Sequence, residues 1–327
     1  MTTEPTASAG IAPAVERSLR RMNPWWAGDP PPLLPPYRRH LVAQIRRRLE
    51  ARLAPIVAVR GARQIGKTTS QLQILGDLLA EGIPPQNLFR IQFDELEGLA
   101  SVGADPIIAL VDWYERAVLG KTLNRAAHDK ERTVLFFDEV QNLDKWAPQL
   151  KSLVDHSTTQ VVVTGSSALR IALGHDSLAG RISTIEAGVL SLTEIGALRG
   201  FALGEPFLAD NGLSPLKRPE LWADLAAHGR KHADARDAAF ACFSELGGYP
   251  IGHALTDVTW EQIADQLNEN VIRRVIQHDL RVGERGRLRD LALLEEVFRL
   301  VCRYAGQCPS IPKLAEEARL AFTKEVT

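Results

Sequence analysis

The sequence is poor in cysteine, lacks any long apolar run and has no excess of either charge. Its cysteines are few and not in metal-ligand spacing, so they suit free thiols in a reducing compartment. They are Cys242, Cys302 and Cys308. No segment approaches the roughly 18 apolar residues of a membrane-spanning helix, and Glu4 and Glu16 lie where a secretory signal would be. We therefore expect a cytoplasmic protein without a membrane partner.

The charge balance excludes a general attraction to nucleic acid. Lys and Arg number 39 and Asp and Glu number 40, which gives a net charge of −1. Any contact with a polyanion must then come from a local patch. The length of 327 residues favours about two domains, and a hydrophobic content of 45% is enough for each to bury a core.

Residues 61–68 have the spacing of a phosphate-binding loop (P-loop), GxxxxGK followed by Ser or Thr. They lie between a short apolar run, 56–59, and a helical pattern that continues to residue 80. In this context the loop amides and the helix start attract phosphate, Lys67 reaches the β- and γ-phosphates, and the Thr68 hydroxyl holds Mg²⁺. The alternative is a glycine-containing turn before an ordinary helix. The predicted nucleotide-binding residues are Gly61, Ala62, Arg63, Gln64, Ile65, Gly66, Lys67, Thr68 and Thr69.

An acidic pair follows a second apolar run, about 70 residues farther on. Residues 133–137 are typical of a strand buried on both faces, and Asp138 and Glu139 come directly after them. Because parallel sheets bind ligands at the carboxyl ends of their strands, we expect Asp138 to hold Mg²⁺ beside Thr68. Glu139 would be the general base that activates the attacking water. The alternative is an acidic helix cap. Asp94, after another strand pattern, would touch the metal shell or cap a loop.

A third strand pattern, residues 160–164, leads into a Gly-Ser-Ser sequence. A small polar side chain at this strand end would hydrogen-bond the γ-phosphate or the attacking water. The preferred candidate for this catalytic role is Ser166, followed by Ser167 and then Thr164. For each of the three, a simple helix cap is the alternative.

Several motifs occur in an order that is specific to one family. Residues 136–146, 150–155, 163–167 and 177–181 resemble prokaryotic AAA-type ATPases in which a nucleotide domain precedes a carboxy-terminal domain of unknown function. The segments 23–26, 246–250 and 276–280 also resemble elements of that group. The resemblance covers most of residues 23–320, strongly to about residue 200 and loosely beyond.

The resemblance implies an α/β fold, a P-loop NTPase three-layer sandwich with a five-strand parallel sheet in AAA order. A helical lid and a partial winged helix would follow, and ATP would be the nucleotide. Arg181 would approach the γ-phosphate from the same or a neighbouring subunit and stabilise charge on the transferred phosphoryl group. A structural salt bridge is the alternative for Arg181. Relatives usually continue into a nuclease-like fold, whereas this sequence ends at Thr327, which puts nuclease-like activity in doubt.

Composition and the family resemblance together imply four segments, of which the AAA-type domain, the lid and the winged-helix start rest on the resemblance. Residues 1–36 are a flexible tail and a proline-rich strap, and 37–200 are the AAA-type nucleotide-binding domain. Residues 201–240 are an insertion or linker, and 241–327 are a helical lid and the start of a winged-helix region. The last segment contains an arginine-rich window from Arg273 to Arg289, a candidate DNA contact. A solvated lid helix or a subunit contact is the alternative.

A helix is also expected over residues 37–54, with leucine and isoleucine at four-residue steps. Its remaining faces carry arginines, Arg38 and Arg39 among them. Such a face is usually solvated, and contact with nucleic acid or an acidic neighbouring subunit is the alternative.

The leading hypothesis is a Mg²⁺-dependent ATPase that couples its nucleotide state to a carboxy-terminal effector or DNA-binding region. Glu139, Lys67, Ser166 and Arg181 would be the catalytic residues, and Thr68 and Asp138 the metal ligands. The alternative is a switch that hydrolyses ATP slowly or not at all and presents a surface to a partner. Self-association is possible in either case. A P-loop kinase for a small molecule is a further class, but it would not need the acidic pair at 138–139.

Overall fold

The computed structural model describes residues 10–166, 176–204, 207, 216, 218–254, 259–280 and 290–325. The chain divides into two compact units, Met1–Leu255 and Thr256–Thr327. Within the described ranges, no helix combines the length and the apolar character needed to cross a lipid bilayer.

The first unit is built on a five-stranded parallel sheet with the order β2-β3-β4-β1-β5. This confirms the predicted α/β fold and its strand order. The strands are β1 (Ile56–Arg60), β2 (Leu88–Gln92), β3 (Val134–Asp138), β4 (Gln160–Gly165) and β5 (Ile182–Glu186).

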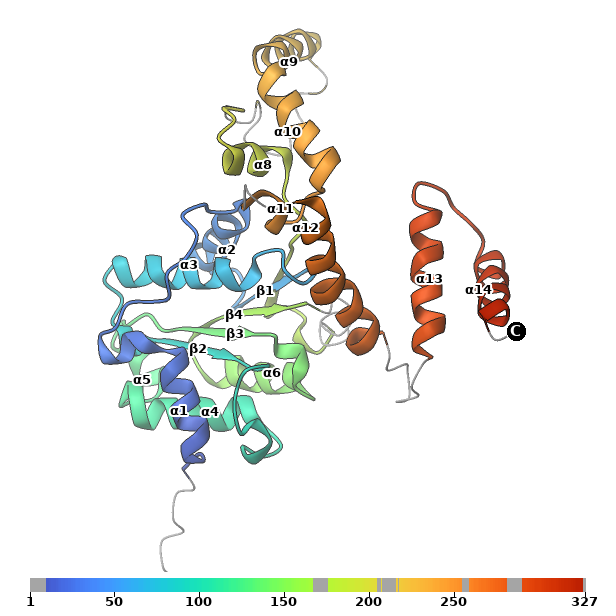
Figure 1. Cartoon of the computed structure of the whole chain (residues 1–327). Coiled ribbons are helices and arrows are strands. Elements are labelled where there is room, and N and C mark those ends of the chain that lie inside the picture. The colour runs from blue at the N-terminus through green and yellow to red at the C-terminus, as the bar shows by residue number, and fades with distance from the viewer. Residues whose placement is uncertain are drawn as a thin grey trace, which may run out of the picture. The chain divides into compact units, whose positions relative to one another are not determined.

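Helices cover both faces of this sheet (Figure 1). Successive side chains of each strand face opposite cores. Phe137 and Val163 pack on the side of α1, α4, α5 and α6, whereas Phe136 and Val162 pack on the side of α2 and α3. This double burial explains why the central strands are continuously apolar. The elements are α1 (Pro13–Met22), η1 (Pro24–Ala27), α2 (His40–Ala51), α3 (Lys67–Ala80), η2 (Pro85–Asn87), η3 (Leu99–Ser101), α4 (Pro106–Tyr114), η4 (Glu115–Leu119), α5 (Leu123–His128), η5 (Val140–Asn142), α6 (Trp146–His156) and η6 (Asp176–Leu178).

The amino-terminal segment differs from the predicted flexible tail. Residues 13–22 form helix α1, and the side chains of Val15 and Leu19 are fully buried in the core. Pro13 starts the helix, and the spacing of Val15, Leu19 and Met22 places all three on one face. The prediction of a tail was therefore wrong over 13–22, because small and polar residues on the outer face conceal the apolar stripe.

The segment after α1 covers the exposed edge of strand β2. The Asn23 side chain accepts a hydrogen bond from the Arg90 backbone N–H at 2.7 Å and donates to the Arg90 carbonyl at 2.8 Å. The indole nitrogens of Trp25 and Trp26 both donate to the Leu88 carbonyl, at 3.1 and 2.9 Å. Side chains thus satisfy backbone groups that an open sheet edge would leave for another strand.

Among the described residues after β5, the first unit contains the helices α8 (Leu192–Arg199), α9 (Pro219–Lys231), α10 (Ala233–Leu246) and α11 (Ile251–Ala254). Helix α10 packs on α8 around Leu190, Ile195 and Ala239. The described part of the predicted insertion or linker at 201–240 thus includes α9 and the first half of α10, which shares a small apolar core with α8.

The second unit contains α12 (Trp260–Leu267), η8 (Asn268–Ile272), η9 (Val275–Asp279), α13 (Leu291–Arg303) and α14 (Ile311–Glu325). Helices α13 and α14 pack together, and the Tyr304 hydroxyl donates to Glu317 Oε1 at 2.6 Å. A winged helix stays a prediction. The structure describes residues 273–280 of the arginine window and, of its arginines, only Arg273 and Arg274, so DNA contact also stays a prediction.

Candidate functional site

The phosphate-loop sequence forms the connection from β1 to α3. Each of its two glycines is required there for a different structural reason. A Cβ on Gly61 would overlap the carbonyl oxygen of Ala187, which follows β5. Gly66 has φ +89°, in the left-handed region, at the residue that caps α3. Ala62, Arg63, Gln64 and Ile65 span the loop between these glycines, and Thr69 lies in the first turn of α3.

Lys67 is the first residue of α3 and is 5% exposed. Its ammonium donates to the carbonyl oxygens of Gly61 at 3.0 Å and Ala62 at 2.6 Å. The lysine therefore lies across its own loop, with its charge held where the loop begins. An ammonium has three donors, so it can exchange carbonyl partners for phosphate oxygens without moving far.

The structure brings Thr68 and Asp138 together from segments that the sequence separates. The Thr68 hydroxyl donates to Asp138 Oδ2 at 2.7 Å, and Thr164 Oγ1 donates to the other carboxylate oxygen. Asp138 is fully buried at the end of β3. A hydroxyl and a carboxylate are the oxygen ligands that Mg²⁺ prefers, so this pair fits the expected metal. Thr164 thus orients Asp138, and its predicted contact with the γ-phosphate or the attacking water stays a prediction.

Sequence reasoning gave no role to Arg90, which lies beside Asp138. Its guanidinium forms a buried ion pair with Asp138 Oδ2 at 3.2 Å, with 7% of the Arg90 side chain exposed. Strands β2 and β3 are neighbours, and the register pairs Gln92 with Asp138. The available signal was an arginine in the middle of an otherwise apolar strand, where an unpaired charge would be costly.

The second acidic residue, Glu139, meets the end of strand β4. Ser166 Oγ donates to Glu139 Oε2 at 2.8 Å, and the Gln141 side-chain amide donates to Glu139 Oε2 and to Ser166 Oγ, the latter at 3.2 Å. Glu139 has φ +55°, which is uncommon for a residue with a side chain and turns the chain sharply after β3. Gln141 was missed by the sequence reasoning. Ser167 lies outside the described residues.

Asp94 lies just beyond β2, and its side chain reaches solvent. Partial burial of its carboxyl, together with the charges of Glu139 and Asp138, raises the pKa of Asp94 above its usual value. The field of the acidic pair thus extends to Asp94. Its contact with metal or water stays a prediction.

The structure does not bring Arg181 to this site. Arg181 precedes β5, and its carbonyl accepts from the Ile56 N–H at the start of β1. Five residues of β1 separate that point from the loop, or about 16 Å at the rise of a strand. The guanidinium forms an ion pair with Asp155, whose second oxygen it reaches at 3.0 Å. Within one chain, Arg181 thus forms the structural salt bridge that was its alternative role. An approach of Arg181 to the γ-phosphate of a neighbouring subunit stays a prediction.

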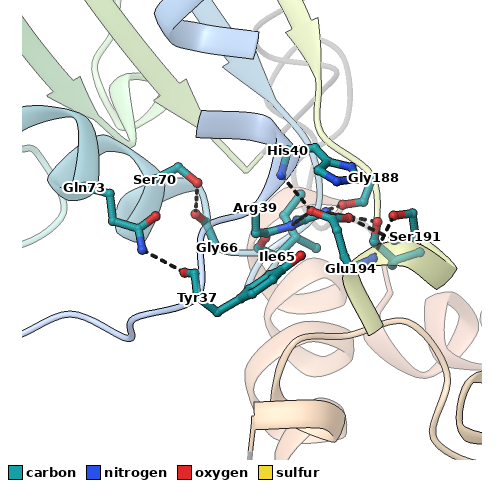
Figure 2. Close-up of polar contacts among 11 residues, drawn as sticks. Tyr37, Arg39, His40, Ile65, Gly66, Ser70, Gln73, Gly188, Ser191 and Glu194 are labelled. Atoms are coloured by element: carbon teal, nitrogen blue, oxygen red, sulfur yellow. Dashed lines mark hydrogen bonds and ion pairs between the residues drawn. The ribbon is translucent and has the colours of Figure 1, made fainter. Parts of the chain in front are cut away.

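Arg39, expected on a solvated helix face, is largely buried beside the loop (Figure 2). Its guanidinium donates to both carboxylate oxygens of Glu194, at 3.0 and 3.1 Å, and to the Ile65 carbonyl. Burial opposes ionisation of Glu194, but Arg39 and the backbone amides of Ser191 and His40 outweigh it and hold the pKa of Glu194 below its usual value.

Tyr37 lies next to this ion pair, and its carbonyl accepts from the Gln73 side chain of α3 at 2.9 Å. Burial and the charge of Glu194 raise the pKa of the Tyr37 hydroxyl to about 12, against the opposing charge of Arg39. The polypeptide before α2 is therefore fastened to both α3 and the start of α8.

Comparison with known proteins gives a family match and a similar solved structure. Residues 53–196 match a family model described as an AAA domain. Among solved structures, the chain is similar to the Walker-type ATPase PABY2304 of Pyrococcus abyssi, with 17% identity and a TM-score of 0.42, over 83% of this chain and 80% of that chain. A search of curated proteins gives no match.

Proposed function

Because residues 53–196 of this chain form an AAA-type P-loop ATPase domain, we propose that the protein binds ATP with Mg²⁺ and hydrolyses it at the carboxyl edge of the sheet. The observation that carries this proposal is the meeting of two pairs from separate segments. They are Thr68 with Asp138, at 2.7 Å, and Ser166 with Glu139, at 2.8 Å.

Phosphate binding falls to the loop and to Lys67. The lysine ammonium would exchange the carbonyls of Gly61 and Ala62 for phosphate oxygens, because a charged acceptor makes the stronger hydrogen bond. The loop amides and the start of α3 add fixed positive dipoles. The Thr68 hydroxyl and the Asp138 carboxylate would hold Mg²⁺, which neutralises phosphate charge when bound.

Water activation falls to Glu139. Its carboxylate would accept a proton from the attacking water, the role of a general base. Ser166 and Gln141 donate to one of its oxygens and so set the direction of the carboxylate. Little covalent help is needed for phosphoryl transfer, so positioned charges account for most of the acceleration.

A slow or non-hydrolysing switch is the second candidate, and one observation favours it. Two carbonyl oxygens hold the Lys67 ammonium, so Lys67 must change partners before it can bind phosphate. A costly change of partners would leave ATP bound for long periods and make the bound state the signal.

Either candidate can couple the nucleotide to the helices after β5. The Leu190 N–H donates to the Gly248 carbonyl at 2.7 Å, and Arg199 donates to the Gly252 carbonyl at 2.6 Å. The chain that leaves the sheet beside the loop is thereby bound to α11. We place this activity in the cytoplasm, where the free cysteines suit the reducing conditions.

The test is Glu139→Gln, which keeps the size of the side chain and removes the base. We expect ATP binding within about twofold of wild type and turnover lower by roughly tenfold or more, measured by phosphate release and by nucleotide titration. The matched control is Glu131→Gln on the amino side of the same strand, where Glu131 pairs with Lys121.

The outcomes separate the two candidates. Equal turnover in wild type and Glu139→Gln would remove Glu139 from the mechanism. A wild-type rate far below about one per second, with or without DNA, would favour the switch. A size measurement with a non-hydrolysable ATP analogue would show whether self-association accompanies nucleotide binding.

A further inference from the structure

The feature that carries a further inference is the position of Arg39 between the phosphate loop and the start of α8 (Figure 2). Its guanidinium donates to the Ile65 carbonyl at 2.5 Å and to the carbonyls of Gly188 and Val189 at 3.2 and 3.1 Å. It also forms the two-pronged ion pair with Glu194. One side chain thus joins the loop, the segment after β5 and helix α8.

The bond to Ile65 controls the direction of the next amide. A trans peptide is planar, so the carbonyl of Ile65 and the N–H of Gly66 point in opposite directions. A carbonyl held toward Arg39 therefore turns the Gly66 N–H to the other side of the loop. The carbonyl of Gly66 is held in turn by the Ser70 N–H at 3.0 Å and hydroxyl at 2.9 Å.

This support matters because Gly66 is the loop residue with the freest backbone. A glycine at φ +89° has no Cβ that resists rotation of the adjoining peptide planes. The carbonyl bonds on both sides fix these planes from outside the residue. Without Arg39, the peptide plane between Ile65 and Gly66 would lose the hydrogen bond to the Ile65 carbonyl, whereas the hydrogen bonds from Ser70 to the Gly66 carbonyl would remain.

The surroundings hold Arg39 in a single orientation. The side chains of Arg39 and Glu194 are 12% and 4% exposed, and Glu194 also accepts from the backbone N–H groups of His40 and Ser191. A planar guanidinium with two bonds to a fixed carboxylate has little freedom to rotate. Lysine could not reproduce this geometry, since its ammonium is a single point.

We propose that Arg39 is a positioning residue for phosphate binding, which keeps the Ile65–Gly66 peptide turned so that its amide serves the nucleotide. Glu194 acts through Arg39 by fixing the guanidinium. This inference rests on the proposed ATP site and adds two residues that lie outside the loop sequence. It predicts that nucleotide affinity depends on Arg39, whereas the chemical step does not.

The experiment compares Arg39→Met and Arg39→Lys with Arg38→Met. Arg38 is the adjacent residue and forms an ion pair with Asp77 of α3, but 46% of its side chain is exposed. We expect Arg39→Met to weaken binding of ATP and ADP about tenfold, the effect of losing one charge-assisted hydrogen bond. Turnover at saturating ATP should stay within about twofold, and Arg38→Met should bind ATP as the wild type does.

A second readout separates positioning from mere stabilisation. Hydrogen exchange of the 65–67 amides without nucleotide should be faster in Arg39→Met than in the wild type, with exchange in the strands unchanged. Arg39→Lys should recover part of the affinity at most. Glu194→Gln should weaken ATP binding less than Arg39→Met, and the double variant should bind no more weakly than Arg39→Met alone, since both residues act through one contact.

Two results would overturn the inference in distinguishable ways. Unchanged ATP affinity in Arg39→Lys and Glu194→Gln, together with a lower unfolding temperature, would make Arg39 a structural clamp only; this holds even if Arg39→Met does not fold. Failure of the wild type to bind ATP, with Lys67→Ala behaving identically, would overturn the proposed function and this inference with it.

Discussion

Arginine–carboxylate pairs are buried at one end of the parallel sheet and exposed at the other. At the carboxyl end, Arg90 and Arg39 are buried and each contacts a carboxylate that is itself almost inaccessible, Asp138 or Glu194. At the amino end, Arg181 forms its ion pair with Asp155 across the surface, with 35% and 31% of the two side chains exposed. All three are arginine–carboxylate pairs on one domain, so they differ mainly in their surroundings.

This difference shows how burial decides what an ion pair contributes. A buried charge that loses its partner keeps the cost of desolvation, whereas an exposed one is solvated by water. The buried pairs are also the ones that contact the phosphate loop and the acidic pair. We therefore expect substitutions at the carboxyl end to change stability or nucleotide binding, and the corresponding substitution at the amino end to change little.

The largest effect on stability is expected from Arg90→Gln. The change leaves Asp138 buried beside Thr68 and Thr164 without its positive partner, and breaking a buried pair from one side typically costs about 3–5 kcal/mol. The measurement is urea unfolding at pH 7, with Arg38→Gln as the exposed control. A loss for Arg90→Gln as small as that of the control would show that water reaches Asp138, and the comparison between the two ends would fail.

A smaller effect is expected from Glu194→Gln, and its pH dependence is the informative part. Because the pKa of Glu194 lies below its usual 4.5, the ionised carboxylate stabilises the folded state. That contribution is complete above pH 4.5 and disappears as the pH falls through the lowered pKa. The free energy of unfolding of the wild type should exceed that of Glu194→Gln by about 2 kcal/mol at pH 7, and this difference should shrink below pH 4.5. A difference constant from pH 7 to pH 3.5 would exclude the charge as its cause.

Much of the fold could be predicted from the sequence because its signals are local. Continuous apolar runs gave the strands, and the order of polar residues after them gave the edge at which the site lies. The loop glycines could be assigned because only glycine tolerates a positive φ or close backbone contact, as at Gly66 and Gly61. The meeting of Thr68 and Asp138 follows from those local signals once β1 and β3 lie parallel in one sheet, with β4 between them.

The partners of buried charges could not be predicted, because they depend on packing between distant segments. Arg39 looked like one of several arginines on a helix, and nothing in its neighbourhood indicates Glu194, 155 positions away. Arg90 was missed for the same reason, since its partner Asp138 lies 48 positions away. The helix α1 was hidden by its polar outer face. Sequence patterns thus located the residues of the candidate site better than the groups that hold them in place.

The smallest effect is expected from Arg181→Ala, which tests the amino end of the sheet. The hydrogen bond to Asp155 raises the pKa of Arg181, but both groups face water, so their loss should barely change the unfolding temperature. ATP turnover should also stay near that of the wild type, because β1 separates Arg181 from the loop of its own chain. The measurement is phosphate release over a range of protein concentrations. A large loss of turnover at unchanged stability, seen only where the protein self-associates, would instead place Arg181 at the γ-phosphate of a neighbouring copy, and exposure alone would then be a poor guide to an arginine's role.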